Sequence, residues 1–417
     1  MLKITEKHKK IEEKITIIRS SKVSIQNSNT NKISNLRDFI SEYKRTTQFF
    51  VDELWKNRDE KIPNLIPNEI TSKLTDSWLS KRAIQCSAKQ ASGIVRGTVK
   101  KQKKRKYVYD KMLEKGHYKK ARKLKKFIDK QITSKPDIKN ISPELDSRFI
   151  QTSLDNNTKN FDGWITLSSL GRKLKIILPF KKNKHFNYML SRGKLKDGVR
   201  ITEKRATFMF EIEPEKQKIG ETIGIDIGSK SVISVSTGFQ SIKNKDNWDL
   251  VKIQDKLSKK KKGSKGFLRT QEHRKNFINW SINQLNLSKT KTLKIEKLTN
   301  VRKNKRVNRK LSHWTYTEII SKLKRTCEDH GVRVLEVSPT YTSQRCSQCG
   351  WVRKRNRKGD LFKCSACGFT HNSDLNAAIN ISLDLPAISK KKRLRQDNRS
   401  GFYWLVKGQE CIVPGTQ

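Results

Sequence analysis

The sequence predicts a multidomain α+β protein. Helical periodicity dominates residues 33–140, short strand patterns follow in residues 141–220, and from residue 221 onward strand and helix patterns alternate as in an α/β domain. A chain of 417 residues suits two or three domains. We therefore expect a first half in which strands flank a helical insert and a second half with its own α/β core.

The charge of the chain indicates which kind of partner it binds. Its 93 Lys and Arg residues exceed its 40 Asp and Glu residues by 53. Such a surplus favours nucleic acid, because basic side chains release counterions from phosphates, and an anionic membrane surface is the alternative. The first twenty residues lack the apolar core of a signal peptide, and no apolar run is long enough to span a bilayer. We expect an intracellular protein without a membrane partner.

The helical region carries the densest basic charge. Its clearest helix runs from about Asp76 to Asp110, where apolar side chains recur at spacings of three and four and form one stripe. Dense charge on a helix usually marks a solvated face, but the basic chain as a whole favours contact with phosphates. The stripe comprises Ile84, Ala88, Ala91, Val95 and Val99, and the candidate nucleic-acid contacts are Lys100, Lys101, Lys103, Lys104 and Arg105.

Strand patterns lie on both sides of this helical region. An apolar alternation at residues 15–18 fits an edge strand, and three further strand patterns occur within residues 141–220. An all-β segment of this size suggests a small barrel, and strands that flank a helical insert would form a two-lobed clamp for nucleic acid. In the second half, a basic loop is expected at about residues 256–265, between the second and third strands.

The first candidate site residue is Asp226. It lies on the polar face of an apolar strand, 222–229, between Gly224 and Gly228, which leave space around its carboxylate. A carboxylate at such a position is costly to desolvate unless it is paired or binds a metal. Taken alone, the motif is equally consistent with a polar residue at the edge of an unrelated hairpin.

Two other acids can reach the same point. Glu296 ends the strand 292–296, and sites in α/β sheets form at strand ends. Asp374 falls in the first turn of a helix that Asn372 or Ser373 can cap, where the helix dipole also favours a carboxylate for structural reasons alone. Three converging carboxylates repel one another and predict Mg²⁺ or Mn²⁺. Two such ions about 4 Å apart would activate a water molecule and stabilise the leaving oxygen of a phosphodiester, which indicates a nuclease.

Two CxxCG motifs predict a zinc ribbon. The first pair is Cys346 and Cys349, the second is Cys364 and Cys367, and a glycine follows each pair. Four thiolates complete a tetrahedral zinc site, and the glycines permit tight turns that direct amide groups toward the sulfurs. The site is expected to be structural, because four thiolates leave no open position. Two separate redox CxxC motifs are the alternative.

The order of these motifs resembles that of the transposon-encoded TnpB proteins and of the compact type V CRISPR effector nucleases. The resemblance covers about residues 221–385, through GIDIG, the strand that ends in Glu, YTSQRCSQCG, the second CxxCG and SDLNAAINI. It implies an RNA-guided DNA endonuclease with one RNase H-like (RuvC) site formed by Asp226, Glu296 and Asp374. It also implies that Arg345 lies near this site and contacts nucleic acid.

The resemblance further implies a domain order and a set of partners. The partners would be a guide RNA and double-stranded target DNA, with a homodimer on one RNA left open, and the cofactors would be Mg²⁺ or Mn²⁺ and structural Zn²⁺. The protein would lie in the bacterial or archaeal cytoplasm, associated with the nucleoid. The expected segments are a β-barrel wedge domain (1–32 and 141–220), a helical recognition domain (33–140), the RuvC domain (221–340 and 372–388), the zinc ribbon (341–371) and a basic tail (389–417).

Three alternatives stay open at this point. A guided DNA-binding repressor that does not cut would share the fold, although three intact acids argue against it. A protein-only RuvC-fold nuclease would need far less basic surface than the first half carries. A transposase also shares the fold, but no helix-turn-helix pattern is evident. The motifs do not separate a transposon-encoded protein from a CRISPR-associated one.

Overall fold

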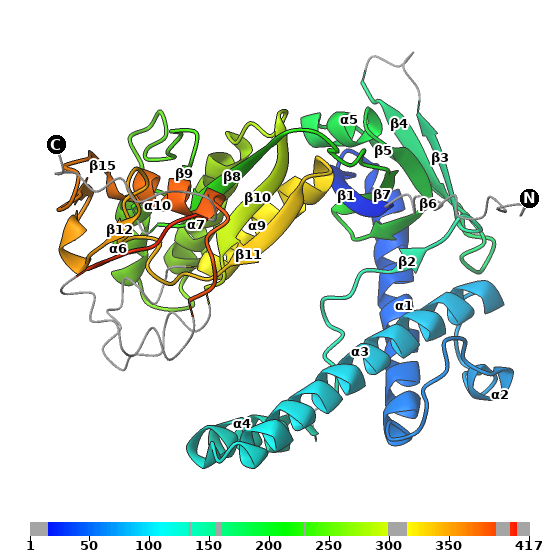
Figure 1. The fold of residues 1–417 in the computed structure, drawn as a ribbon. Coiled ribbons are helices and arrows are strands. Elements are labelled where there is room, and N and C mark those ends of the chain that lie inside the picture. Colours follow the sequence, from blue (N-terminus) through cyan, green and yellow to red (C-terminus); the bar gives the residue numbers. More distant parts are fainter. Residues whose placement is uncertain are drawn as a thin grey trace, which may run out of the picture. The chain divides into compact units, whose positions relative to one another are not determined.

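The chain divides into two compact units, with the boundary between Glu213 and Pro214 (Figure 1). None of the described helices is long and apolar enough to cross a membrane. The finer division into seven segments stays a prediction. The computed structural model describes residues 16–132, 135–154, 160–228, 230–298, 315–388 and 401–406.

The first unit contains two antiparallel sheets. Its strands are β1 (Ile17–Ser24), β2 (Glu144–Leu145), β3 (Ile150–Leu154), β4 (Gly163–Leu167), β5 (Ile176–Phe180), β6 (Lys194–Ile201) and β7 (Arg205–Ile212). One sheet has the order β1-β7-β6-β2 and the other has the order β3-β4-β5. β1 is an edge strand, as the alternation at residues 15–18 predicted, although it begins two residues later than that pattern.

The two sheets share one hydrophobic core instead of closing into a single ring. Among the described strands, none pairs one sheet with the other, so the expected barrel has no hydrogen-bonded closure here. A short helix that the sequence did not predict, α5 (Lys184–Leu190), supplies the reason. Its Phe186 packs against Phe180 of β5 and Phe208 of β7, with ring centroids 5.9 and 5.3 Å apart. The two sheets are therefore joined by side-chain packing around α5.

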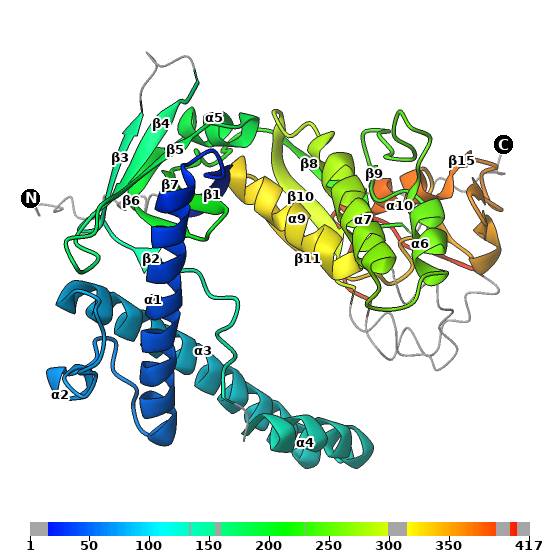
Figure 2. The same cartoon turned by 180° about the vertical axis from the view of Figure 1, so that it is seen from behind.

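Helices connect β1 to β2 in this unit (Figure 2). They are α1 (Thr30–Lys56), α2 (Asn68–Thr71), α3 (Lys81–Glu114) and α4 (Tyr118–Ile132). Ser80 begins α3 by accepting a hydrogen bond from the Ala83 N–H at 3.1 Å. The predicted apolar stripe is confirmed, because Ala88, Ala91 and Val95 are buried in one cluster with side chains of α1.

The second unit is built on a mixed four-stranded sheet, which confirms the α/β expectation for this half. Its strands are β8 (Glu221–Asp226), β9 (Ser234–Val235), β10 (Thr290–Glu296) and β11 (Arg333–Val337). The order is β11-β10-β8-β9. β8, β10 and β11 run parallel, whereas β9 runs antiparallel to β8. The carboxyl ends of β8 and β10 consequently lie side by side.

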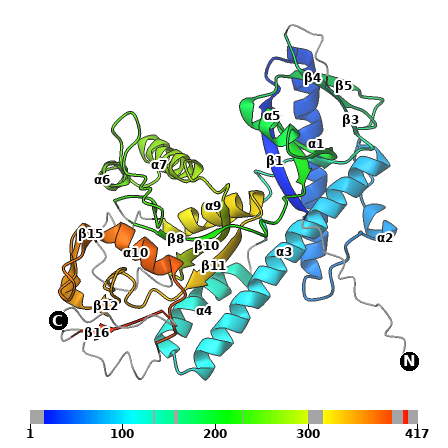
Figure 3. The same ribbon diagram turned by 45° about the horizontal axis from the view of Figure 1, so that its top comes forward.

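Helices cover both faces of this sheet (Figure 3). They are α6 (Leu250–Ser258), α7 (Lys265–Asn283), α9 (Tyr316–Asp329) and α10 (Ser373–Ser382). α6, α7 and α9 share a core with Ile223 and Ile225 of β8. α10 covers the opposite face of β8 at Gly224, where an added Cβ would lie 2.1 Å from the Ala378 carbonyl oxygen. Glycine at this position therefore permits the close approach of α10.

The basic loop expected at about residues 256–265 is shorter than predicted. Helix α6 extends to Ser258 and α7 begins at Lys265, so the sequence interpretation was wrong about both flanks of the loop. The dense lysines concealed the apolar positions of these helices. Leu257 and Phe267 are both buried, although each stands among several basic residues.

A four-cysteine ribbon interrupts the sheet domain between β11 and α10. Its elements are β12 (Trp351–Val352), the 3₁₀ turn η1 (Lys354–Asn356), β13 (Arg357–Lys358), β14 (Leu361–Lys363) and β15 (Thr370–Asn372). β13, β14 and β15 form one sheet. β12 pairs with β16 (Phe402–Tyr403), so part of the segment expected as a basic tail packs onto the ribbon.

Candidate functional site

The fold brings the three predicted acids to one end of the second unit's sheet. Asp226 and Glu296 end the neighbouring parallel strands β8 and β10. Asp374 lies in the first turn of α10, which packs on β8. The cap of α10 is Asn372, whose Oδ1 accepts hydrogen bonds from the backbone N–H groups of Asp374 and Leu375 at 3.0 and 3.1 Å. The turn that carries Asp374 is thereby fixed at the carboxyl end of β8.

Burial raises the pKa values of two of these acids, Asp226 and Glu296. Burial, followed by the charges of Glu296 and Asp374, raises the pKa of Asp226 to about 8. Burial also raises the pKa of Glu296, although a hydrogen bond from Thr342 opposes that effect. An ionised carboxylate in such a place requires a compensating positive charge. The donor set therefore fits divalent cations that prefer oxygen ligands.

The three carboxylates stand farther apart than the ligands of a single ion. Among the described residues, the four cysteines are the one group of His, Cys, Asp or Glu side chains whose ligand atoms all lie within 4.8 Å of one another. The acids do not meet that condition.

An arginine of the four-cysteine ribbon reaches this acid cluster. Arg357, the first residue of β13, donates from Nη2 to Oδ1 of Asp374 at 2.7 Å. Its charge lowers the pKa values of Asp226 and Glu296, against the effect of burial. The sequence showed Arg357 only as one member of a basic run between the two CxxCG motifs. Nothing in that run distinguished the residue whose side chain turns toward the acids.

Arg345, by contrast, is buried and does not offer its guanidinium to nucleic acid. Its Nε donates to the Trp404 carbonyl oxygen at 2.6 Å, and its Nη1 donates to the Cys346 carbonyl oxygen at 3.1 Å and to Asn380 Oδ1 at 2.7 Å. This position contradicts the prediction that Arg345 is a nucleic-acid contact. Motif order could place an arginine near the site, but it could not show which side chain points inward.

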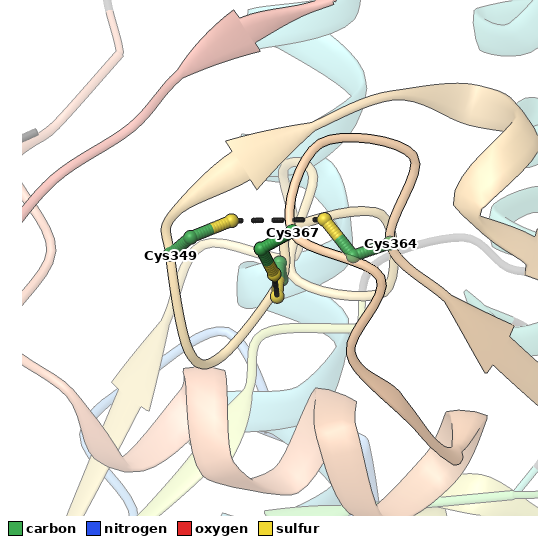
Figure 4. Close-up of side chains that lie close together, drawn as sticks. Cys349, Cys364 and Cys367 are labelled. Atoms are coloured by element: carbon green, nitrogen blue, oxygen red, sulfur yellow. Dashed lines mark hydrogen bonds between the residues drawn. The ribbon is translucent and has the colours of Figure 1, made fainter. Parts of the chain in front are cut away.

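The four predicted zinc ligands meet at one point. Figure 4 shows Cys349, Cys364 and Cys367 of this cluster. The Sγ atoms of Cys346 and Cys367 are 3.8 Å apart, and those of Cys349 and Cys364 are 3.6 Å apart. Sulfurs that surround a zinc ion tetrahedrally at about 2.3 Å lie about 3.8 Å from one another, so the spacing suits this metal. Gly350 has a φ of 79°, which permits the turn that closes the first pair. His371 is not part of the cluster.

The predicted nucleic-acid contacts of the first unit lie on α3, beyond its buried stripe. Lys100, Lys101, Lys103 and Lys104 are exposed, and Arg105 is half-buried. The basic tract continues on α4 with exposed Lys119, Lys120, Arg122 and Lys123. The arrangement presents a dense positive charge to solvent, as a phosphate backbone would require.

Comparisons with known proteins show that this chain is similar to a group of related proteins. Residues 316–381 match the family model described as Cas12f1-like, TNB domain. The chain is 44% identical over 100 residues to the CRISPR-associated endodeoxyribonuclease Cas12f1 of Sulfoacidibacillus thermotolerans, over 24% of this chain and 23% of that protein. It is 35% identical over 92 residues to the TnpB-like protein aq_aa05 of Aquifex aeolicus (strain VF5), over 20% and 30% of the two chains. It is 39% identical over 83 residues to a candidate RNA-guided DNA endonuclease, InsQ, of Escherichia coli (strain K12), over 20% and 21%.

These features define a class of proteins. Its members have a sheet domain with an acidic cluster at the strand ends and an inserted four-cysteine ribbon. The relationship to the TnpB proteins and the compact type V effectors, predicted from the motifs, is confirmed by these matches. The aligned segments span less than a third of the length of each of the three relatives.

Proposed function

We propose that this chain is an RNA-guided DNA endonuclease that hydrolyses phosphodiester bonds. The observation that carries the proposal is the convergence of Asp226, Glu296 and Asp374 at the ends of β8 and β10 and the start of α10. The names of related proteins, which describe DNA endonucleases and in one case an RNA-guided one, support the same activity.

The acid cluster would hold two divalent cations, Mg²⁺ or Mn²⁺. At such a site these ions supply the activation of a water molecule and the stabilisation of the leaving oxygen. Asp226 binds as a carboxylate, so it releases its proton when the site fills. Glu296 and Asp374 provide the remaining hard oxygen ligands. Arg357 bonds only Oδ1 of Asp374, and its charge is well placed to attract a phosphate group of the substrate toward the acids.

The remaining parts of the chain would bind and place the nucleic acids. The basic surface of α3 and α4 fits the backbone of a guide RNA or of its duplex with DNA. Base pairing with the guide, and not protein side chains, would then read the target sequence. The four-cysteine cluster would bind one structural Zn²⁺, because its thiolates leave no open coordination position.

The proposal is tested by expressing the chain together with its flanking genomic DNA and sequencing the RNA that co-purifies. We expect a discrete scaffold joined to a variable guide. A plasmid that matches the guide should then be cut in Mg²⁺ and left intact in EDTA. Target binding without cutting by the wild-type chain would instead indicate a guided repressor. Fragmented bulk RNA, together with guide-independent cutting, would indicate a protein-only nuclease.

A further inference from the structure

Glu296 has a hydrogen-bond partner in the segment that leads into the first zinc-binding pair. Thr342 is buried, and its Oγ1 donates to Oε1 of Glu296 at 2.5 Å. A tight turn holds Thr342 in place, because the Tyr341 carbonyl oxygen accepts from the N–H groups of Gln344 and Arg345 at 2.9 and 3.0 Å. The hydroxyl therefore occupies one oxygen of Glu296 and restrains the orientation of its carboxylate.

The same segment is bonded to α10 through two buried amides. Nδ2 of Asn380 donates to the carbonyl oxygens of Thr342 and Arg345 at 2.9 and 2.7 Å. One turn earlier, Nδ2 of Asn376 donates to the Arg345 carbonyl oxygen at 2.8 Å, and its Oδ1 accepts from the Ser347 N–H at 3.0 Å. Both amides are at most 1% exposed, so water does not compete for these bonds. α10 is thus tied to backbone on both sides of Cys346.

These contacts give residues 342–347, here called the knuckle support, a role in the geometry of the acid cluster. Asp374 lies in the first turn of α10, and a helix of ten residues moves as one body. A shift of the knuckle support would therefore move Asp374 through α10 and Glu296 through Thr342. Cys346, a predicted zinc ligand, lies within the support, so binding of zinc also restrains it.

We propose that the knuckle support positions the nuclease acids, with Thr342 as the positioning residue for Glu296 and Asn380 as the link to the helix that carries Asp374. This inference rests on the proposed nuclease function of the acid cluster. It assigns the zinc ribbon a second task beyond its own stability. Hydrogen-bond partners of metal ligands commonly change metal affinity by about 10–100-fold when they are removed, because they fix the orientation of the ligand.

The test compares Thr342→Val, which keeps the shape but loses the hydroxyl, with Thr342→Ser, which keeps the hydroxyl. Binding of Mn²⁺ to the full zinc-loaded chain is measured by calorimetry, without RNA or cleavage. We expect Thr342→Val to raise the Mn²⁺ Kd at least about tenfold and Thr342→Ser to stay within about twofold of wild type. Thr340→Val is the matched control, because it removes a nearby hydroxyl that lies 2.9 Å from the Ser338 hydroxyl.

A second variant keeps the inference testable if Thr342→Val loses zinc or unfolds. Asn380→Asp retains the acceptor for Arg345 and removes both amide donors, so it should weaken Mn²⁺ binding while four cysteines still hold one zinc per chain. Mn²⁺ binding as tight as wild type in either folded, zinc-loaded variant would overturn the inference. If the Asp226→Asn variant bound Mn²⁺ as tightly as the wild-type chain, that result would instead overturn the proposed function.

Discussion

The two predicted metal sites of the second unit are built in opposite ways. The cysteine ligands come from one short stretch, Cys346 to Cys367, and their sulfurs all lie within 4.8 Å of one another. The acids come from three distant positions, Asp226, Glu296 and Asp374, and stand farther apart. The first site is closed by local turns, whereas the second exists only because β8, β10 and α10 meet.

This difference explains what each site can do and what each site needs. A closed thiolate site leaves no position for a substrate and serves structure. An open carboxylate site can admit substrate, but it depends on neighbours that hold its ligands in place. Thr342, Arg357 and the cap residue Asn372 are such neighbours. We expect substitutions at the two sites to have different effects. Substitutions at the cysteine site should reduce stability, and substitutions at the acid cluster should reduce metal binding or the cleavage rate.

The largest effect on stability is expected from Cys349→Ser. Zinc binding in small zinc-finger peptides contributes about 10–16 kcal/mol to folding, so a lost ligand should remove zinc and loosen the ribbon. Metal analysis should show zinc falling from one atom per chain toward zero, and calorimetry should show an earlier transition in the second unit. Cys86→Ala is the control, because Cys86 is buried in the first unit. Full zinc retention in Cys349→Ser would refute the four-cysteine site.

A large effect on rate, with zinc retained, is expected from Arg357→Ala. The variant removes the one described arginine that donates to a nuclease acid, and the loss of a charged donor at a reacting group typically slows catalysis by about 10²–10³. Single-turnover cleavage by the guide-bound complex provides the measurement. Arg355→Ala, an exposed neighbour in the same ribbon, should change the rate only a few-fold. Equal effects of the two substitutions would remove the special role given to Arg357.

Binding of Mn²⁺ at the acid cluster should depend on pH. The pKa of Asp226 is raised to about 8 without cations, so lowering the pH below that value makes a cation compete with a proton. Release of one proton on binding makes Mn²⁺ affinity rise about tenfold per pH unit up to about pH 8 and level off above it. Calorimetry between pH 6 and pH 9 measures this slope. A flat profile across pH 6–8 would contradict the raised pKa of Asp226.

The smallest effects are expected on α3, far from either metal site in the sequence. Lys101→Ala and Lys104→Ala should each weaken RNA binding a few-fold and reduce the slope of log affinity against log salt by about 1. The cleavage rate at saturating RNA should stay the same. Lys245→Ala, an exposed lysine of the second unit, is the control. A salt slope that stays unchanged in both α3 variants would remove α3 from the nucleic-acid interface.

The contrast between a site built from one short stretch and a site built from distant residues also explains how much of each site could be predicted from the sequence. The cysteine site follows from spacing alone, and the acids stood out because Asp226 interrupts an apolar strand and Asp374 follows a helix cap. Arg357 could not be selected, because its role depends on the path of β13 beside α10. Arg345 was assigned the wrong surroundings for the same reason, since its burial depends on contacts with Asn380 and Trp404.

Two parts of the fold were hidden from sequence patterns for physical reasons. Lysine-rich segments concealed α6 and α7, because long charged side chains surround the few apolar residues that pack inward. The closure of the first unit's sheets could not be judged either, because α5 is short and its Phe186 fills space between strands from distant segments.

The most direct test of the central claim is cleavage of a guide-matched DNA by wild type and Asp226→Asn, each in complex with guide RNA and Mg²⁺. The variant keeps the shape of the side chain and removes its charge. We predict unchanged target binding and a cleavage rate at least about a thousandfold lower, which corresponds to about 4 kcal/mol of barrier. Cutting by Asp226→Asn at the wild-type rate would show that the acid cluster is not the nuclease site.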